Sequence, residues 1–476
     1  MSLWVNLFIA TITLLIPTTI VLESGLHSVP IWTTLIIFGF SIFRLVLQRH
    51  YDFLYASLLC FFYIFLILAP LLQMQHGTFP WVDFYYEEDV YMAWWITCLA
   101  LLFFEFGYLL FQTLPAYKKL KPEEITSIPR LTPFGGGVLA LSAVLLTILG
   151  LAFTGVDSLF LPRNEAALML GDKVGGLSPV RLIISSLMRV PPVIIMLVLL
   201  YDFYLRRMNN PEQPWFTKNT LYLVLVGLIV AIVNNPVSTA RFWVGAIVLS
   251  VVLLLLYSRK KNTAFMWFTL NLSIVILVFP LSDIYRKSLD VNPLEDELAV
   301  MNPSEELVTS PDFDAFQQQV NVKIVTDEAG FQYGRQILSS VFFFVPRVFW
   351  PNKSEATGVL VANQLNYKFD NLSTPLMAEF YIDAGIPGVV IGMLLLGMLY
   401  QYLNLISRQF TILVATFYCL LASYQFYLLR GSLMTVTNYL VVAIATYWVL
   451  YYFRDRLFAK DPLTITGKVF YRRVYQ

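Results

Sequence analysis

Charged residues are scarce in this chain of 476 residues: Asp, Glu, Lys and Arg make up 13% of it, whereas hydrophobic residues make up 58%. A soluble protein carries about 25% charged residues, which cover its surface in water. Half of that share leaves too little charge to coat a globule of this length. The composition therefore predicts an all-α integral membrane protein, because helices satisfy their own backbone groups within the hydrocarbon.

The sequence also lacks the motifs of several enzyme and transport classes. It contains no GxxxxGK[ST] loop, which excludes ATP-driven transport within this chain, and no GxGxxG, HExxH or GxSxG motif. Its 3 histidines and 3 cysteines are scattered without metal-ligand spacing. With 32 basic and 31 acidic residues, the chain has no overall field that would attract nucleic acid. We therefore expect no metal, no cofactor and no nucleic-acid partner.

Long apolar runs are the main feature that the sequence does have. A helix needs about 20 predominantly apolar residues to cross the hydrocarbon, and counting such runs predicts about twelve transmembrane helices. The seventh run is the shortest of them. The predicted spans are 3–22, 29–47, 54–74, 90–114, 134–153, 181–203, 220–235, 241–257, 263–281, 387–406, 410–428 and 435–453. Glu105 lies inside the fourth span, where we favour a structural role for its carboxylate over a role in a cavity.

The distribution of Lys and Arg predicts that both termini are cytoplasmic, because positive charge resists translocation. Basic residues are frequent in the connections on the predicted inner side and in the tail, 454–476. The predicted outer loops near 23–28 and 75–89 contain no Lys or Arg. The pattern is typical of a multi-pass membrane protein with both termini inside.

One connection, 282–386, is far longer than a membrane hairpin needs, and loops of that length are usually functional. The chain thus divides into spans one to nine (1–281), a large extracytoplasmic loop (282–386), spans ten to twelve (387–453) and a cytoplasmic tail (454–476). Within the loop, the polar stretch 305–319 is expected to be mobile. A helical pattern from Phe316 onward is expected to lie on the membrane surface or to cap the bundle.

Basic residues on the predicted outer side are the main candidates for a binding site. An arginine fork donates two hydrogen bonds to a phosphate and keeps its charge when desolvated. A charge at membrane depth costs about 3 kcal/mol or more, so it normally faces a cavity or a partner. The alternative for each residue is snorkelling to headgroups or an ion pair with a carboxylate such as Asp283, Glu355 or Glu379. The candidates are Arg163, Arg189, Arg241, Arg286, Arg347, Lys353 and Arg430.

Carboxylates on the same side are candidates for a general base. Asp283 follows the ninth span, and Glu379 and Asp383 lie four positions apart just before the tenth, on one face if that segment is helical. Glu379 and Asp283 are the leading candidates, and the alternative is an ion pair that holds the loop. The DxD at 312–314 has the spacing of a metal site, but this short pattern is frequent by chance. The acidic run at 87–89 could hold a metal or act as a base, but we favour a solvated acidic loop.

Four stretches together resemble the O-antigen polymerase family, the polymerases of oligosaccharide repeat units in bacterial surface polysaccharides. They are 235–243 (NPVSTARFW), 280–286 (PLSDIYR), 346–353 (PRVFWPNK) and 379–385 (EFYIDAG) with Gly388. Their order and the predicted topology match as well. The resemblance covers roughly 220–435 well and the first half of the chain mainly through its hydropathy.

The resemblance implies a GT-C-like polymerase on the outer face of the bacterial cytoplasmic (inner) membrane. Such an enzyme would transfer a growing O-antigen or exopolysaccharide from undecaprenyl diphosphate to the non-reducing end of an incoming lipid-linked repeat unit. It would use no nucleotide sugar and no required metal, and it would work with a flippase and a chain-length regulator. Arginines in two outer loops are associated with function in parts of the family. Arg347 matches one of these loops, and Arg163 fits the other more loosely.

These considerations give one set of candidate roles. The predicted catalytic residues are Arg347, Arg286, Glu379 and Asp283. The predicted binding residues for diphosphate and glycan are Arg163, Arg241, Arg430, Lys353, Trp350 and Tyr381, and Trp81 could also stack on a sugar ring.

Two rival functions stay open. A ligase of the same membrane class would depend on a histidine in the large outer loop, and 282–386 contains no histidine. A transporter of polysaccharide or lipid-linked oligosaccharide should show repeated halves and polar groups at mid-membrane positions. Here the charges gather at the outer ends of the spans, so the sequence favours the polymerase.

Overall fold

The computed structural model describes residues 3–47, 52–82, 85–115, 117, 127–161, 179–209, 212, 214–257, 263–278, 303–370, 372–408, 411–459 and 463–464. Within these ranges the chain is almost entirely helical, and its one sheet is an antiparallel pair of two-residue strands, β1 (Ser127–Ile128) and β2 (Leu463–Thr464). The prediction of an all-α protein is confirmed to this extent. The predicted site residues Arg163, Asp283 and Arg286 lie outside the described residues.

Eight helices of the described part are long and apolar enough to cross a membrane. They are α1 (Leu3–Ser24), α2 (Val29–Leu47), the continuous run α3–η1–α4 (Phe53–His76), α5 (Glu87–Thr113), α7 (Pro133–Thr154), α9 (Pro179–Asn209), α19 (Leu376–Ser407) and α22 (Leu433–Tyr452). Shorter apolar helices occupy the other predicted spans: α10 (Lys218–Val233), α11 (Arg241–Tyr257), α12 with η3 (Thr263–Ser273 and Ile274–Val278) and α20 (Ile412–Ser423), which α21 (Gln425–Arg430) follows. The chain is a multi-pass membrane protein, and the count of twelve spans stays a prediction.

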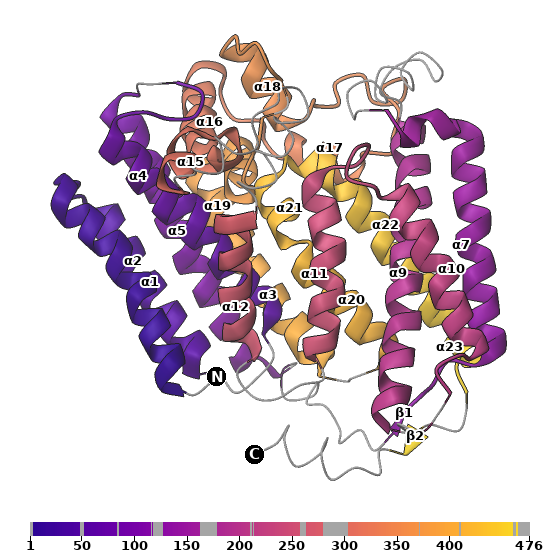
Figure 1. The fold of residues 1–476 in the computed structure, drawn as a ribbon. Helices are drawn as coiled ribbons and strands as arrows, with labels where there is room; N and C mark the ends of the chain where they lie inside the picture. The colour runs from indigo at the N-terminus through magenta and orange to yellow at the C-terminus, as the bar shows by residue number, and fades with distance from the viewer. Residues whose placement is uncertain are drawn as a thin grey trace, which may run out of the picture.

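The described part of the large loop, 303–370 and 372–386, gathers at one end of the helical bundle, which we call the loop end. Its described elements are α15 (Pro303–Thr309), η4 (Pro311–Phe313), α16 (Ala315–Ala329), α17 (Arg335–Val341), α18 (Thr357–Gln364) and the first turns of α19. The first residues of α1, the strands β1 and β2, and the short helix α23 (Arg454–Leu457) lie at the opposite end (Figure 1). These elements and the described part of the large loop therefore lie at opposite ends of the bundle.

The expectation of a mobile polar stretch at 305–319 is wrong. This stretch forms α15, η4 and the start of α16, and α16 packs against α5 and α19 as a cap on the bundle. Gln317, Gln318 and Gln319 are fully buried. Their amides find partners inside the protein: Gln317, for example, accepts from the backbone N–H of Trp81 at 3.1 Å and donates to the Tyr85 hydroxyl at 2.8 Å. Burial of these amides is tolerated because they are hydrogen-bonded.

The α5–α19 pair fixes the loop end to the bundle. A side chain at Gly107 of α5 would collide with the backbone of Leu394, and one at Gly397 of α19 would collide with the backbone of Phe104. Small residues let helix backbones approach this closely in a membrane protein. Nearer the start of α19 the backbone breaks its helical angles at Ala384 and Gly385, and Gly385 takes φ +64°, which favours glycine. The break separates the loop part of α19 from its long apolar part.

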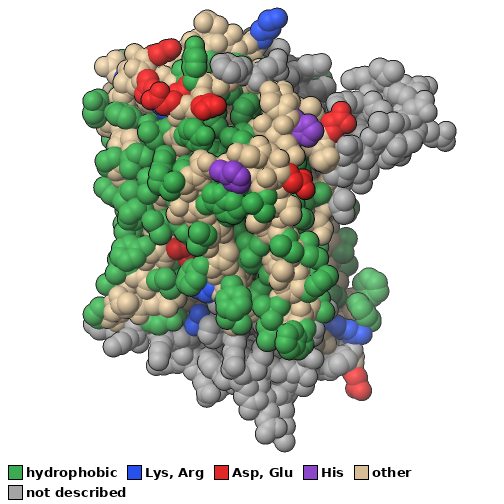
Figure 2. Space-filling view, turned by 90° about the vertical axis from the view of Figure 1, so that its left-hand side faces the viewer, with side chains coloured by type: hydrophobic (Ala, Val, Ile, Leu, Met, Phe, Trp, Pro, Cys, Tyr) green, Lys and Arg blue, Asp and Glu red, His purple; other side chains and the backbone are tan. Residues whose placement is uncertain are grey.

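The surface of the bundle is apolar over much of its height. Figure 2 shows a broad band of hydrophobic side chains on the face that carries α1 and α2, with several acidic side chains gathered toward the loop end. Large apolar side chains such as Phe8 and Phe153 are more than half exposed. Such a surface suits a lipid environment.

Candidate functional site

An open cleft lies at the loop end, with an empty volume of about 1920 Å³ that includes the solvent at its mouth. Five separate parts of the chain line it: Trp81, the segment before and at the start of α11, η4, the segment around α18, and the turn between α21 and α22. Two of the predicted binding residues, Arg241 and Arg430, lie in this lining. They are far apart in the sequence, so only the fold brings them together.

Arg430 ends α21 and points into the η4 segment. It donates to the carbonyl oxygens of Pro311 and Asp312 at 2.8 and 2.9 Å, and its Nη2 lies 3.1 Å from Asp314 Oδ1. The guanidinium carbon also lies 5.1 Å from the ring centroid of Phe242. The side chain is 15% exposed. Arg430 therefore uses several of its N–H groups to hold η4 and keeps limited access to the cleft.

Arg241 begins α11 and pairs with the other carboxylate of the DxD. Its Nη2 lies 3.2 Å from Asp312 Oδ2, and the Arg241 side chain is 29% exposed against 14% for Asp312. Each arginine of the cleft therefore has one carboxylate of its own. The sequence left ion pairing open as the alternative role of these arginines, and both are ion-paired in the structure. Their partners are Asp312 and Asp314, which were not among the carboxylates that the sequence suggested.

Asp314 is the buried centre of this cluster. Besides Arg430, it accepts from the Ser373 hydroxyl at 2.5 Å and from the Trp81 indole N–H at 2.9 Å. Its side chain is 2% exposed, so these partners compensate a charge that would otherwise be costly to bury. Sequence reasoning missed this role because it treated the DxD as a chance metal motif. The one signal for it was the pair of outer arginines, which needed counter-charges.

The two carboxylates at the start of α19 hold other elements in place. Glu379 is 1% exposed and accepts from the Leu433 backbone N–H at 2.7 Å, from the Ser432 hydroxyl at 3.1 Å and from the Thr357 hydroxyl. It therefore holds the start of α22 against α18. Asp383 accepts from the backbone N–H groups of Gln336 and Ile337 at 2.9 and 2.8 Å and caps α17. Glu379 does not line the cleft, although Ser432 does.

The remaining predicted site residues also lie outside the cleft lining. Arg347 donates to the carbonyl oxygens of Lys353 and Ser354 at 2.6 and 3.2 Å, and the Lys353 ammonium donates to those of Phe343 and Val345 at 2.6 and 3.0 Å. These bonds close the turn between α17 and α18. Burial and, secondly, the charge of Arg347 lower the pKa of the Lys353 ammonium.

Of the predicted aromatic residues, Trp350 lies in the same turn and lines neither the cleft nor the other described pockets. Tyr381 is 5% exposed and packs edge-on against Phe331, with 5.9 Å between ring centroids. The roles of Arg347, Lys353, Trp350 and Tyr381 in substrate binding stay predictions.

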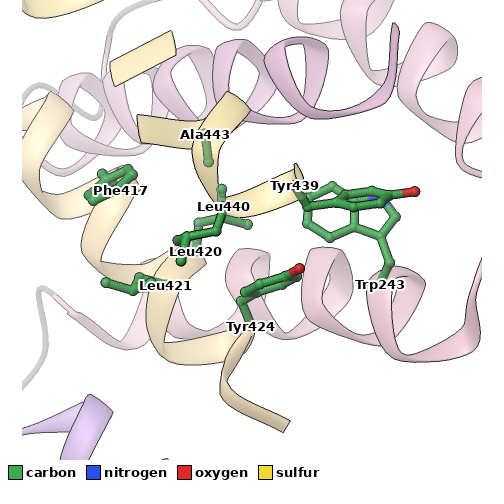
Figure 3. Close-up of a pocket in the computed structure, with 8 residues that line it drawn as sticks. All are labelled: Trp243, Phe417, Leu420, Leu421, Tyr424, Tyr439, Leu440 and Ala443. Carbon is green, nitrogen blue, oxygen red and sulfur yellow. The ribbon is translucent and has the colours of Figure 1, made fainter. Parts of the chain in front are cut away.

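A small apolar pocket lies between α11, α20 and α22, with an empty volume of about 250 Å³ (Figure 3). In it the rings of Trp243 and Tyr439 lie against one another at 4.8 Å between centroids. Arg189 of α9 reaches this region and donates to the Tyr439 hydroxyl at 3.5 Å and to the Ser238 carbonyl oxygen at 3.4 Å. In the described part of the chain, no group of His, Cys, Asp and Glu could hold a metal ion.

A family model described as "Putative O-antigen polymerase" matches residues 181–435, which is more than half of the chain. The chain belongs to the O-antigen polymerase family. The match includes every described element that lines the cleft except Trp81. Comparisons with curated proteins and with solved structures gave no match.

Within the region matched to the O-antigen polymerase family, one of the stretches that carried the resemblance lines the cleft and another supports its wall. Residues 235–243 supply Arg241 and the wall before α11, and 379–385 hold the start of α22 through Glu379. The stretch 346–353 forms the turn that Arg347 closes, and 280–286 lies outside the described residues. The family's pattern thus corresponds partly to the cleft wall and partly to the residues that support it.

Proposed function

We propose that this chain polymerises lipid-linked oligosaccharide repeat units in the cleft at the loop end. It would transfer the growing glycan from undecaprenyl diphosphate to the non-reducing end of an incoming lipid-linked unit. The observation that carries the proposal is the cleft itself, where Arg241 and Arg430 line one open cavity within the family-matched region. Fixed cations at such a place can stabilise the charge that develops on a leaving diphosphate.

The proposed reaction forms one glycosidic C–O bond and breaks another. The acceptor hydroxyl attacks the anomeric carbon and loses its proton, and undecaprenyl diphosphate leaves with the bonding electron pair. Arg241 and Arg430 would face the diphosphate, and Asp312 and Asp314 would keep the two guanidinium groups oriented. Asp283 remains the proposed general base. Glu379 is better described as a positioning residue, because it acts on the cleft wall through Ser432 and Leu433.

The proposal includes the finer architecture. We propose twelve spans in a GT-C-like arrangement in the bacterial cytoplasmic membrane, with both termini inside and 282–386 outside. The division into 1–281, 282–386, 387–453 and 454–476 belongs to the same proposal, as do a flippase that delivers the units and a chain-length regulator. The asymmetry of Lys and Arg between the two sides supports this orientation.

The orientation predicts the outcome of cysteine labelling. Glu328 is exposed at the end of α16 at the loop end, and Lys218 is exposed at the start of α10 at the opposite end. A membrane-impermeant maleimide should modify Glu328→Cys in intact cells and Lys218→Cys only after permeabilisation. The native Cys60, Cys98 and Cys419 are buried and give little background. The reverse labelling pattern would overturn the orientation and the site with it.

The reaction itself is tested with the purified protein in lipid vesicles. Supplied with undecaprenyl-diphosphate-linked repeat units alone, it should make long chains without nucleotide sugar or ATP, because the donor bond already carries the energy. EDTA should leave the rate unchanged, since fixed arginines supply the charge stabilisation. Activity lost with EDTA and restored by Mg²⁺ would contradict this mechanism. A ligase would move the glycan to another acceptor, and a transporter would form no bond.

A further inference from the structure

A second cavity, which we call the tyrosine groove, lies beside the cleft and takes no part in the proposed transfer. Its empty volume is about 1020 Å³, with open solvent included. It runs between the start of α5, the middle of α16 and the segment after α18. Its lining residues share a high content of aromatic rings and amides, and they include Trp81, Tyr85, Tyr86, Asn321, Asn366, Tyr367 and Lys368.

The tyrosine groove adjoins the cleft. Trp81 lines both cavities. One continuous part of the chain also serves both: 365–368 line the groove, and Phe369 and Asp370 line the cleft. Trp81 stacks on Phe369 with 5.8 Å between ring centroids and 19° between the planes, so the two rings form the boundary. The two cavities therefore meet at Trp81.

The chemistry of the groove suits a polyhydroxylated ligand. An aromatic ring offers an apolar face to the C–H groups of a sugar, and a tyrosine adds a hydroxyl. Amide side chains donate and accept at the same time, as sugar hydroxyls do. Tyr86 is 74% exposed, and Asn366 is also exposed. Aliphatic residues are a minority of the lining, so the groove is a poor match for an acyl chain.

Three rings of the groove, those of Trp81, Tyr85 and Tyr367, are held in place before any ligand arrives. The Tyr85 hydroxyl donates to Asn321 Oδ1 at 2.7 Å, and Asn321 Nδ2 donates to the Tyr367 hydroxyl at 3.0 Å. Gln317 donates to the Tyr85 hydroxyl at 2.8 Å, and Asp314 holds the indole N–H of Trp81 at 2.9 Å. A preorganised site loses little side-chain entropy on binding. Asp314 also connects the groove to the arginine pair of the cleft.

We propose that the tyrosine groove is a glycan subsite, which holds sugar residues several units from the reacting end. This inference rests on the proposed polymerase function. Retention of the chain in the groove between transfers would favour further extension over release. The groove would then raise the number of transfers made before the chain is released, whereas the cleft sets the rate of each transfer and the chain-length regulator acts in addition.

The test uses Tyr86→Ala and Tyr367→Ala in the full-length protein, with Tyr333→Ala as the matched control. Tyr333 is also at the loop end, is 87% exposed and lines neither cavity. Two quantities are measured for each variant: the length distribution made in vesicles, and the Kd for glycan released by mild acid from the wild-type polymer. The melting temperature in detergent identifies variants that do not fold.

The groove variants should bind the released glycan about fivefold to tenfold more weakly, which corresponds to loss of one aromatic contact. They should shorten the product by more than they slow formation of the first bond. Tyr333→Ala should behave as wild type. Wild-type lengths and wild-type Kd in both folded groove variants would overturn the subsite while leaving the polymerase function intact. If the wild-type protein makes no polymer at all, the proposed function fails and the subsite fails with it.

Discussion

Replacing Arg430 with alanine is expected to stop polymer synthesis almost completely. Loss of a cation that stabilises the leaving diphosphate should cost about 3 kcal/mol in the transition state, or about a hundredfold in rate. Arg430→Lys should fail nearly as badly, because one ammonium cannot replace a fork that reaches Pro311, Asp312 and Asp314 together. The measurement is the initial rate of chain extension in vesicles, per amount of correctly inserted protein.

Arg430→Ala should also lower stability, because it leaves Asp314 buried without its partner. Breaking such a pair from one side typically costs about 3–5 kcal/mol. The double variant Arg430→Ala, Asp314→Asn separates the two effects, since it removes both charges. Its melting temperature should return toward wild type while its activity stays low. Long polymer from a well-folded Arg430→Ala protein would remove Arg430 from the site.

The positions of the apolar helices could be predicted because hydropathy is a local property. Every predicted span whose residues the structure describes coincides with an apolar helix. The polar stretch at 305–319 shows the limit of that approach. From the sequence alone, its glutamines are expected to be exposed to solvent. Only the packing of α16 against α5 shows that they are buried and hydrogen-bonded to residues such as Tyr85.

The candidate site was predicted only in part, for a similar reason. Arg241 and Arg430 were found because arginine is rare on the predicted outer side, and both line the cleft. Their partners could not be found, because Asp312 lies 71 positions from Arg241 and Asp314 lies 116 from Arg430. Arg347 carried the family motif, and the structure shows its guanidinium bonded to carbonyl oxygens of its own turn. A motif identifies the residue type and does not reveal which atoms it contacts.

The second large effect is expected toward the opposite end of the bundle, where the last turn of α2 meets the second half of α5. Arg44 Nη2 lies 2.7 Å from Glu105 Oε2, with side chains 14% and 5% exposed. The other oxygen of the Glu105 carboxylate accepts a hydrogen bond from the Ser41 hydroxyl at 2.6 Å and another from the Tyr55 hydroxyl at 2.5 Å. The guanidinium carbon of Arg44 also lies 4.5 Å from the ring centroids of Tyr55 and Tyr108. The structural role favoured for Glu105 agrees with these contacts.

Glu105→Leu should destabilise the protein by about 3–5 kcal/mol, because it leaves Arg44 charged and unpaired in an apolar interior. The double variant Glu105→Leu, Arg44→Leu should recover most of that loss, since replacing a whole buried pair with apolar residues is often nearly neutral. Thermal unfolding in detergent measures both. Chain extension per folded molecule should stay at the wild-type rate, because neither residue lines the cleft or the tyrosine groove. If the double variant is as unstable as Glu105→Leu alone, the ion pair with Arg44 is not what stabilises this region. The hydrogen bonds that Ser41 and Tyr55 donate to the Glu105 carboxylate would then be the stabilising contacts.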